Sequence, residues 1–320
     1  MTPQFKTIVK GCLEFGNKKS FGMMQAQLLK RQESYYKNDI LLKDLSYFQE
    51  ETFTIEVPRS QFVYVDKTYK NTLAFLYELR DFALAGSFHL WVVDEKNVVK
   101  KSATIIPNSD KSANVEYNNG NRFIERKDYV AAIGAFGRAI DKYDQYTQAY
   151  ERRGYAYFLH HSHEDALMDY AKSLALRLTP EAFFGRAEVL ISLGDYKGAV
   201  LDLQKAIDNS LPYQSIFWSS RRLKGVSHSK IGEFDKAANE FKYFTKRHFS
   251  ENDVNHAHKT ESLQMYLKAL QKIGEDKTVK EVTAKLRELG IIEIPDKSHP
   301  VSTPAGLRAT AKGKASALAI

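Results

Sequence analysis

The chain of 320 residues contains a single cysteine, Cys12. One thiol cannot build an intramolecular disulfide framework, nor a zinc or iron–sulfur site that needs several cysteines. We therefore expect Cys12 to be a buried small side chain. The sequence also lacks G-x-G-x-x-G, G-x-x-x-x-G-K-[ST], H-E-x-x-H and G-x-S-x-G, so nucleotide binding, zinc proteolysis and serine hydrolysis are not indicated.

Long apolar stretches are absent as well. No run approaches the ~18 residues that span a bilayer, and the first twenty residues lack the apolar core of a secretory signal. We expect a cytoplasmic protein without membrane contact. The net charge of +8 is spread along the chain, but half of it comes from cations after Asp296, the last acidic residue: Lys297, Arg308, Lys312 and Lys314. This pattern predicts a disordered basic tail over residues 291–320 and no basic binding domain.

Residues 113–251 repeat one pattern four times. Each copy has a small residue, an alanine twelve positions later, and a large apolar residue four positions after that. The three positions are held in turn by Gly120, Ala132 and Phe136; Gly154, Ala166 and Tyr170; Ala187, Ala199 and Leu203; and Gly225, Ala237 and Phe241.

This register resembles the tetratricopeptide repeat (TPR) family. A TPR is a helix–turn–helix of ~34 residues whose copies stack into a right-handed superhelix. Glycine or alanine in helix A lets it lie close against helix B of the same repeat. The chain departs from the family at the position before the small residue, which is usually leucine but is polar here: Asn119, Arg153, Arg186 and Lys224.

The resemblance implies a mostly α fold, a TPR α-solenoid preceded by a small α+β domain. We expect the α+β domain over residues 1–112. The repeats are expected near 113–146, 147–179, 180–213 and 218–251, followed by a degenerate capping hairpin at 253–290.

The N-terminal third shows no repeat. Residues 52–68 alternate apolar and polar side chains, which predicts one or two strands broken at Pro58. Residues 87–107 predict a hairpin with its turn at 94–97. Residues 23–36 and 69–86 have helical periodicity.

Three histidines, His160, His161 and His163, stand together in the second repeat. Neutral imidazoles are good metal ligands, so a metal site is one interpretation. The register favours another, in which they form the turn between helices and His163 replaces an aromatic residue. Tyr129, Tyr196 and Phe234 hold its position in the other repeats. We predict no metal and no cofactor.

The resemblance implies a protein or peptide partner in the concave groove lined by helix A. The register places these side chains there: Tyr117, Asn121, Glu151, Tyr155, Phe184, Glu188 and Arg222. The clamp by which some TPR proteins hold a terminal carboxylate is not supported, because Arg152, Glu181 and Gly185 occupy its other positions. We predict a non-enzymatic protein-binding adaptor, with an unrecognised activity in residues 1–112 left open.

A second hypothesis rests on arginines that recur once per repeat. Arg152, Arg153, Arg186 and Arg221 either pair with carboxylates inside the repeats or form a ladder of anion contacts. A ladder, with the basic tail, would suit an RNA- or ribosome-associated protein.

Overall fold

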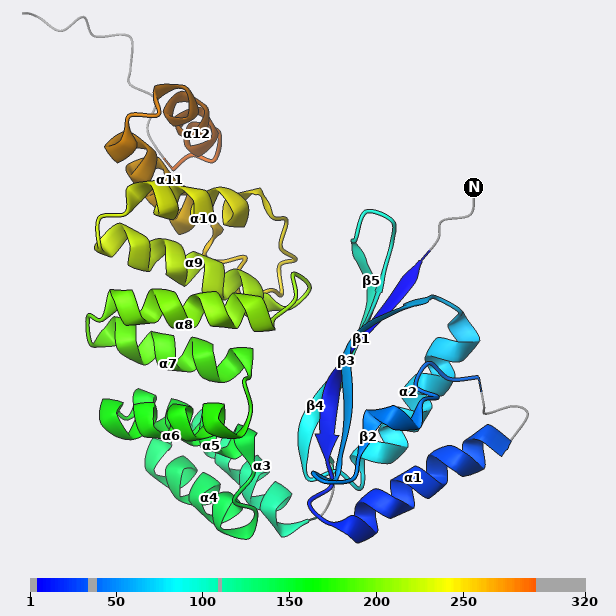
Figure 1. Ribbon diagram of the computed structural model, residues 1–320. Helices are drawn as coiled ribbons and strands as arrows, with labels where there is room; N and C mark the ends of the chain where they lie inside the picture. Colours follow the sequence, from blue (N-terminus) through cyan, green and yellow to red (C-terminus); the bar gives the residue numbers. More distant parts are fainter. Residues whose placement is uncertain (1–4, 34–38, 109–110, 292–320) are drawn as a thin grey trace, which may run out of the picture.

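The structure is a computed structural model that describes residues 5–33, 39–108 and 111–291. It consists of an antiparallel sheet with two helices, followed by a stack of helical hairpins (Figure 1). This arrangement confirms the predicted fold class. Apart from Ile291, the predicted disordered tail lies outside the described residues.

The sheet has the strand order β2-β3-β1-β4-β5. Its strands are β1 (Lys6–Glu14), β2 (Phe48–Gln49), β3 (Thr54–Val63), β4 (Ala85–Val93) and β5 (Val99–Ile105). A short 3-10 helix, η1 (Leu45–Tyr47), precedes β2. The β4–β5 hairpin turns at the predicted place, where Asp94 Oδ1 accepts from the amides of Lys96 and Val98.

The predicted break at Pro58 is wrong, because β3 is one continuous strand. Its register against β1 shifts between Val9 and Gly11, opposite Ser60 and Val57. Pro58 lies at this irregularity, where the regular hydrogen bonds between β1 and β3 are already interrupted. The N–H that proline lacks is therefore not needed there.

The sequence patterns predict no strand at β1, although it is the middle strand of the sheet. Most of its side chains are buried on both faces. A strand covered on both sides does not alternate apolar and polar residues, so the usual strand signal is missing.

Two helices, α1 (Lys18–Glu33) and α2 (Asp66–Arg80), cover one face of the sheet (Figure 1). The main core forms there, where Leu28 and Leu76 meet Val9, Phe88 and Leu90. The opposite face turns toward the helical hairpins.

The hairpins pair consecutive helices, each joined by a short turn. They are α3 (Ser112–Glu125) with α4 (Tyr129–Lys142), α5 (Thr147–Leu159) with α6 (His163–Leu176), α7 (Pro180–Ser192) with α8 (Tyr196–Asn209), α9 (Ser215–Lys230) with α10 (Phe234–Lys246), and α11 (Lys259–Ile273) with α12 (Asp276–Glu288). The fifth hairpin buries an apolar stripe of α11, which consists of Leu263, Tyr266, Leu267 and Leu270.

Close packing of helix A on helix B depends on the small residues of the repeat. A Cβ added at Gly120 would lie 2.5 Å from the ring of Phe136, and one at Gly225 would lie 3.0 Å from that of Phe241. The alanines Ala132 and Ala237 are buried beside these rings. The small, alanine and large apolar positions of the repeat pattern therefore correspond to contacts between helix A and helix B.

The sheet meets the solenoid first near its start. Glu14 of β1 is buried, and its carboxylate accepts from the Tyr143 hydroxyl at 3.2 Å and pairs with the Arg177 guanidinium at 3.1 Å. Lys111 Nζ donates to the carbonyls of Phe15 and Phe82. These contacts fix the first two hairpins to one end of the sheet.

The second contact lies at the loop between α8 and α9. Leu211 is buried against Ile8, Trp91 and Val93 of the sheet. The ring of Tyr213 packs on Trp91 with centroids 5.9 Å apart. The solenoid thus holds the sheet at two separate points.

Candidate binding cavity between the sheet and the solenoid

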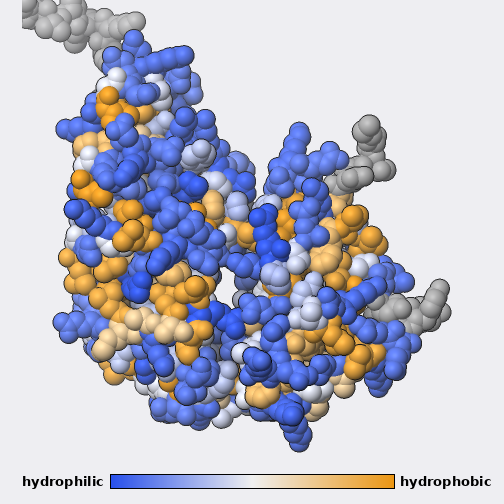
Figure 2. Space-filling view, viewed as in Figure 1, coloured by the Kyte–Doolittle hydropathy of each residue, from blue (hydrophilic) through white to orange (hydrophobic). Residues whose placement is uncertain are grey.

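A cavity of about 860 Å³ lies between the sheet and helices α3, α5 and α7. Figure 2 shows the hollow between the two halves of the molecule. The two contacts between sheet and solenoid described above lie at its two ends. Helix A of each of the first three repeats forms one wall of the cavity, and the sheet forms the other.

The solenoid wall repeats one spacing. Positions i, i+3, i+4 and i+7 of each helix A line the cavity, because these positions share one face of an α-helix. They are Asn114, Tyr117, Asn118 and Asn121 on α3; Gln148, Glu151, Arg152 and Tyr155 on α5; and Glu181, Phe184, Gly185 and Glu188 on α7.

Six of the seven predicted groove residues are brought together here: Tyr117, Asn121, Glu151, Tyr155, Phe184 and Glu188. The seventh, Arg222 of α9, does not line the cavity. Its Nε is buried without an acceptor among the described residues, and burial lowers the pKa of its guanidinium. The binding role of all seven residues stays a prediction.

The sheet wall was not predicted. It comprises Lys10 and Cys12 of β1, Glu56 of β3, Ser87 and His89 of β4, and Thr104 of β5. These strands carry no motif that predicts a cavity wall, because the wall forms only where the sheet packs against the solenoid. Cys12 is buried as expected, and burial raises the pKa of its thiol to about 12.

Carboxylates dominate the solenoid wall. Glu151 is buried and accepts from the hydroxyls of Ser173, at 3.2 Å, and Thr179. Burial, with the nearby charge of Glu181, raises the pKa of Glu151 to about 8. Burial also raises the pKa of Glu188 to about 7. Glu181 is exposed within the cavity; desolvation by the neighbouring protein raises its pKa, and the charge of Lys10 opposes this shift.

The recurring arginines have partners inside the repeats. Arg153 pairs with Asp169, Arg186 with Asp202, and Arg221 with Glu240, at 2.8, 2.6 and 2.7 Å. Arg152 instead donates to Asn121 Oδ1 at 2.8 Å, and its guanidinium lies 5.3 Å from the Tyr155 ring centroid. Arg153, Arg186 and Arg221 thus follow the pairing alternative, whereas Arg152 has no carboxylate partner among the described residues.

The histidines form the predicted turn between α5 and α6. His163 begins α6, and its ring meets Phe158 edge-on with centroids 6.0 Å apart. His161 has φ +62°, as Lys127 has φ +61° in the first turn. Within the described part of the chain, no group of three or more His, Cys, Asp or Glu side chains is arranged to hold a metal ion.

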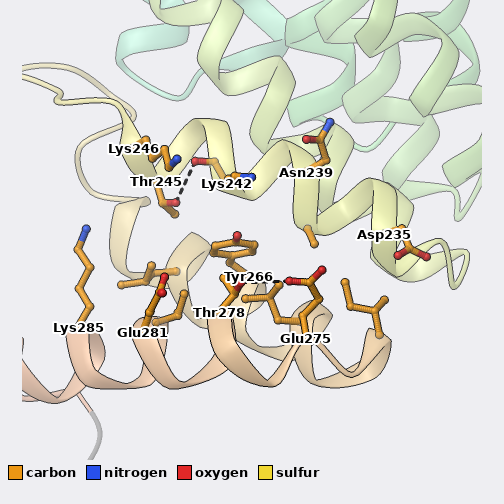
Figure 3. Close-up of a pocket in the computed structure, with 15 residues that line it drawn as sticks. Asp235, Asn239, Lys242, Thr245, Lys246, Tyr266, Glu275, Thr278, Glu281 and Lys285 are labelled. Atoms are coloured by element: carbon orange, nitrogen blue, oxygen red, sulfur yellow. Dashed lines mark hydrogen bonds between the residues drawn. The ribbon is translucent and has the colours of Figure 1, made fainter.

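A second cavity, of about 600 Å³, lies in the last hairpins (Figure 3). Tyr266, Leu270 and Val282 line it with apolar surface. Lys242 of α10 and Lys285 of α12 contribute from the two helices on either side. None of the predicted groove residues lines it.

Comparison with known proteins supports the repeat. Residues 117–182 match the family model of the tetratricopeptide repeat. With the hairpins and buried alanines above, this identifies the segment as TPR and the helical array as a repeat solenoid. Among curated proteins no sequence matches the chain.

Several solved structures resemble the chain. A MamA protein is 17% identical over 58% of this chain and 99% of its own, with a TM-score of 0.46. MamA of Desulfovibrio magneticus RS-1 is 17% identical over 56% and 96%, with a TM-score of 0.47. YrrB, described as a TPR protein with an unusual peptide-binding site, is 17% identical over 57% and 86%, with a TM-score of 0.45. Separately, none of the helices in the described residues has the length and apolar character needed to cross a membrane.

Proposed function

We propose that this chain is a non-enzymatic adaptor that binds a partner protein by holding a peptide segment in the cavity between sheet and solenoid. One observation carries the proposal. Six residues chosen from the repeat register alone line a single cavity of about 860 Å³. Pockets that bind drug-sized ligands commonly have ~300–1,000 Å³, so this cavity has room for one or a few side chains of a partner.

The walls have the composition of a protein-binding site. Tyr117, Tyr155 and Phe184 supply aromatic surface, and aromatic residues carry much of the binding energy at protein interfaces. Asn118 and Asn121 supply amide groups that can donate to and accept from a peptide backbone.

The arginine contacts favour this function over phosphate binding. Arg153, Arg186 and Arg221 already pair with carboxylates that are 6–8% exposed. Contact with RNA phosphates would have to break these pairs and leave buried carboxylates without a partner, which is costly.

Partner capture tests the proposal. The full chain and its Tyr155→Ala/Phe184→Ala variant are immobilised and exposed to a lysate of the source cells, and the retained proteins are identified. We expect a specific partner with the wild type and its loss with the double variant. Tyr243→Ala is the matched control, because Tyr243 of α10 is 52% exposed and outside the cavity. Equal capture by all three proteins would refute the groove as the binding site.

A further inference from the structure

Three carboxylates line the cavity, and none of them has a direct ion pair among the described residues. Glu181 and Glu188 lie seven residues apart on α7, two turns along the same face, and Glu151 reaches the cavity from α5. None of them forms an ion pair with a lysine, arginine or histidine in the described residues. In the part of the chain that the structure describes, Glu151 accepts from the neutral hydroxyl groups of Ser173 and Thr179.

Elsewhere in the described solenoid, three buried carboxylates have cationic partners. Asp169, Asp202 and Glu240 are each 6–8% exposed, and each contacts an arginine or lysine of the same hairpin. The cavity wall that the repeat register assigns to ligands differs, because Glu151 is buried to the same degree and Glu188 is half-buried, and neither has an ion pair among the described residues. Burying a carboxylate without a cation costs free energy, which an incoming cation recovers.

The cations that line the cavity are engaged with other groups. Lys10 Nζ donates to the Asn209 carbonyl at 2.7 Å, and Arg177 pairs with Glu14 outside the cavity lining. Arg152 donates to Asn121 and lies over the Tyr155 ring. None of the three forms an ion pair with the glutamates of α5 and α7 in the described residues. Cations act on these glutamates only through space: Lys10, Arg152 and Arg222 partly offset the raised pKa values of Glu181, Glu151 and Glu188.

Another acceptor in the cavity lacks a donor. Gln148 lines the cavity one turn before Glu151 on α5, and its Oε1 is buried without a hydrogen-bond donor among the described residues. A ligand with several N–H groups would supply one. Phe184 stands between Glu181 and Glu188 on α7 and offers an apolar surface for an aliphatic stem.

We propose that the cavity receives a lysine or arginine side chain of the partner peptide, with its charged head among Glu151, Glu181 and Glu188 and its stem on Phe184. This inference rests on the proposed function and adds the chemistry of the bound residue. The carboxylates would then be ionised in the complex, where the cation offsets their burial.

A peptide library separates this inference from the proposed function. Random twelve-residue peptides on phage are selected against the full chain and three variants of it. The variants are Tyr155→Ala/Phe184→Ala, Glu181→Gln/Glu188→Gln, and Glu288→Gln, which removes an exposed charge on α12. We expect the wild type and the Glu288→Gln control to enrich peptides with lysine or arginine beside an apolar residue. The double variant should still enrich peptides but lose the basic preference.

A selected peptide then gives the size of the effect. Its dissociation constant is measured by fluorescence anisotropy, beside a version in which norleucine replaces the basic residue. Loss of either charge partner should weaken binding by about tenfold or more. Folding of each variant is checked by circular dichroism, and glutamine keeps the shape of the side chain it replaces.

Three outcomes would contradict these proposals, and they can be told apart. The inference is overturned if the enriched peptides show no preference for lysine or arginine, or if Glu181→Gln/Glu188→Gln keeps that preference. The proposed function would still stand in both cases. No enrichment relative to Tyr155→Ala/Phe184→Ala overturns the proposed function, and the inference with it. Displacement of the peptide by equimolar spermidine would show that the cavity binds small polyamines instead.

Discussion

Arg153 of α5 donates two hydrogen bonds to the carboxylate of Asp169 on α6, from Nε and Nη2, each 2.8 Å long. The same spacing of sixteen residues joins Arg186 to Asp202. It also joins Lys224 to Glu240, at 2.8 Å. These pairs explain why the position usually held by leucine in a TPR is a cation in the second, third and fourth repeats of this chain. An ion pair between helix A and helix B replaces an apolar contact.

Asp169→Ala should lower the free energy of unfolding by about 2–4 kcal/mol, because it leaves the Arg153 guanidinium without its partner. Urea unfolding followed by circular dichroism measures the change. Arg153→Leu combined with Asp169→Ala restores an apolar contact, and we expect it to fall within about 1 kcal/mol of the wild type. The first repeat already has Ala135 at the position of Asp169. A double variant less stable than Asp169→Ala alone would contradict this explanation.

The turns between helices predict stabilising substitutions. Lys127 and His161 have φ near +60°, where Gly194 and Gly232 stand in later repeats. A non-glycine residue pays a steric cost in this conformation. Lys127→Gly and His161→Gly should each raise the free energy of unfolding by about 0.5–1 kcal/mol. Gly194→Ala is the reverse control and should lower it, as measured by thermal and urea unfolding.

His163→Tyr tests the histidine turn. Its ring packs against Phe158 as a tyrosine would, so the stability should change by less than about 0.5 kcal/mol. Added zinc should leave the melting temperature of the wild type unchanged. A rise that disappears in the variant would instead indicate a metal site.

The buried Glu151 predicts how stability depends on pH. Its pKa of about 8 in the folded protein lies above that of an unfolded chain, about 4.3. Between these values the folded state keeps a proton that the unfolded chain has released. The free energy of unfolding should therefore fall as pH rises from about 5 to 8, by at most about 1.4 kcal/mol per pH unit from this group. Arg152 opposes the shift and Glu181 enhances it.

Urea unfolding at pH 5.5, 6.5 and 7.5 measures this slope. Glu151→Gln cannot ionise, and its slope should be shallower than that of the wild type. Glu288→Gln removes an exposed carboxylate and should keep the wild-type slope. If Glu151→Gln is as steep as the wild type, Glu151 is ionised over this range.

We expect the contact at Leu211 to hold the sheet against the solenoid. Leu211→Asp places a charge among Ile8, Trp91 and Val93, which is unfavourable without a partner. We expect the sheet to separate from the α8–α9 loop, with a larger radius of gyration by small-angle X-ray scattering and weaker peptide binding. Leu201→Asp, at a leucine that is 66% exposed, is the control. An unchanged radius for Leu211→Asp would show that the loop is not needed to hold the sheet.

The repeat register predicted the solenoid wall because each helix A packs on its own helix B. Gly120 against Phe136 is one such local contact, and the direction of Tyr117 follows from it. The sheet wall could not be predicted in this way. Trp91 and Leu211 are in contact although more than a hundred residues separate them in the sequence. The sequence around each one predicts only an ordinary core residue. The missed strand β1 shares this cause, since docking of the solenoid buries the face that would otherwise be polar.

Site-specific photocrosslinking tests most directly whether the partner lies between the two walls. p-Benzoylphenylalanine replaces Ser87 on the sheet wall, Phe184 on the solenoid wall, or Tyr243 outside the cavity. The complex with the captured partner or a selected peptide is then irradiated, and adducts are mapped by mass spectrometry. We predict adducts from positions 87 and 184 and none from 243. Adducts from position 243 alone would contradict binding in the cavity.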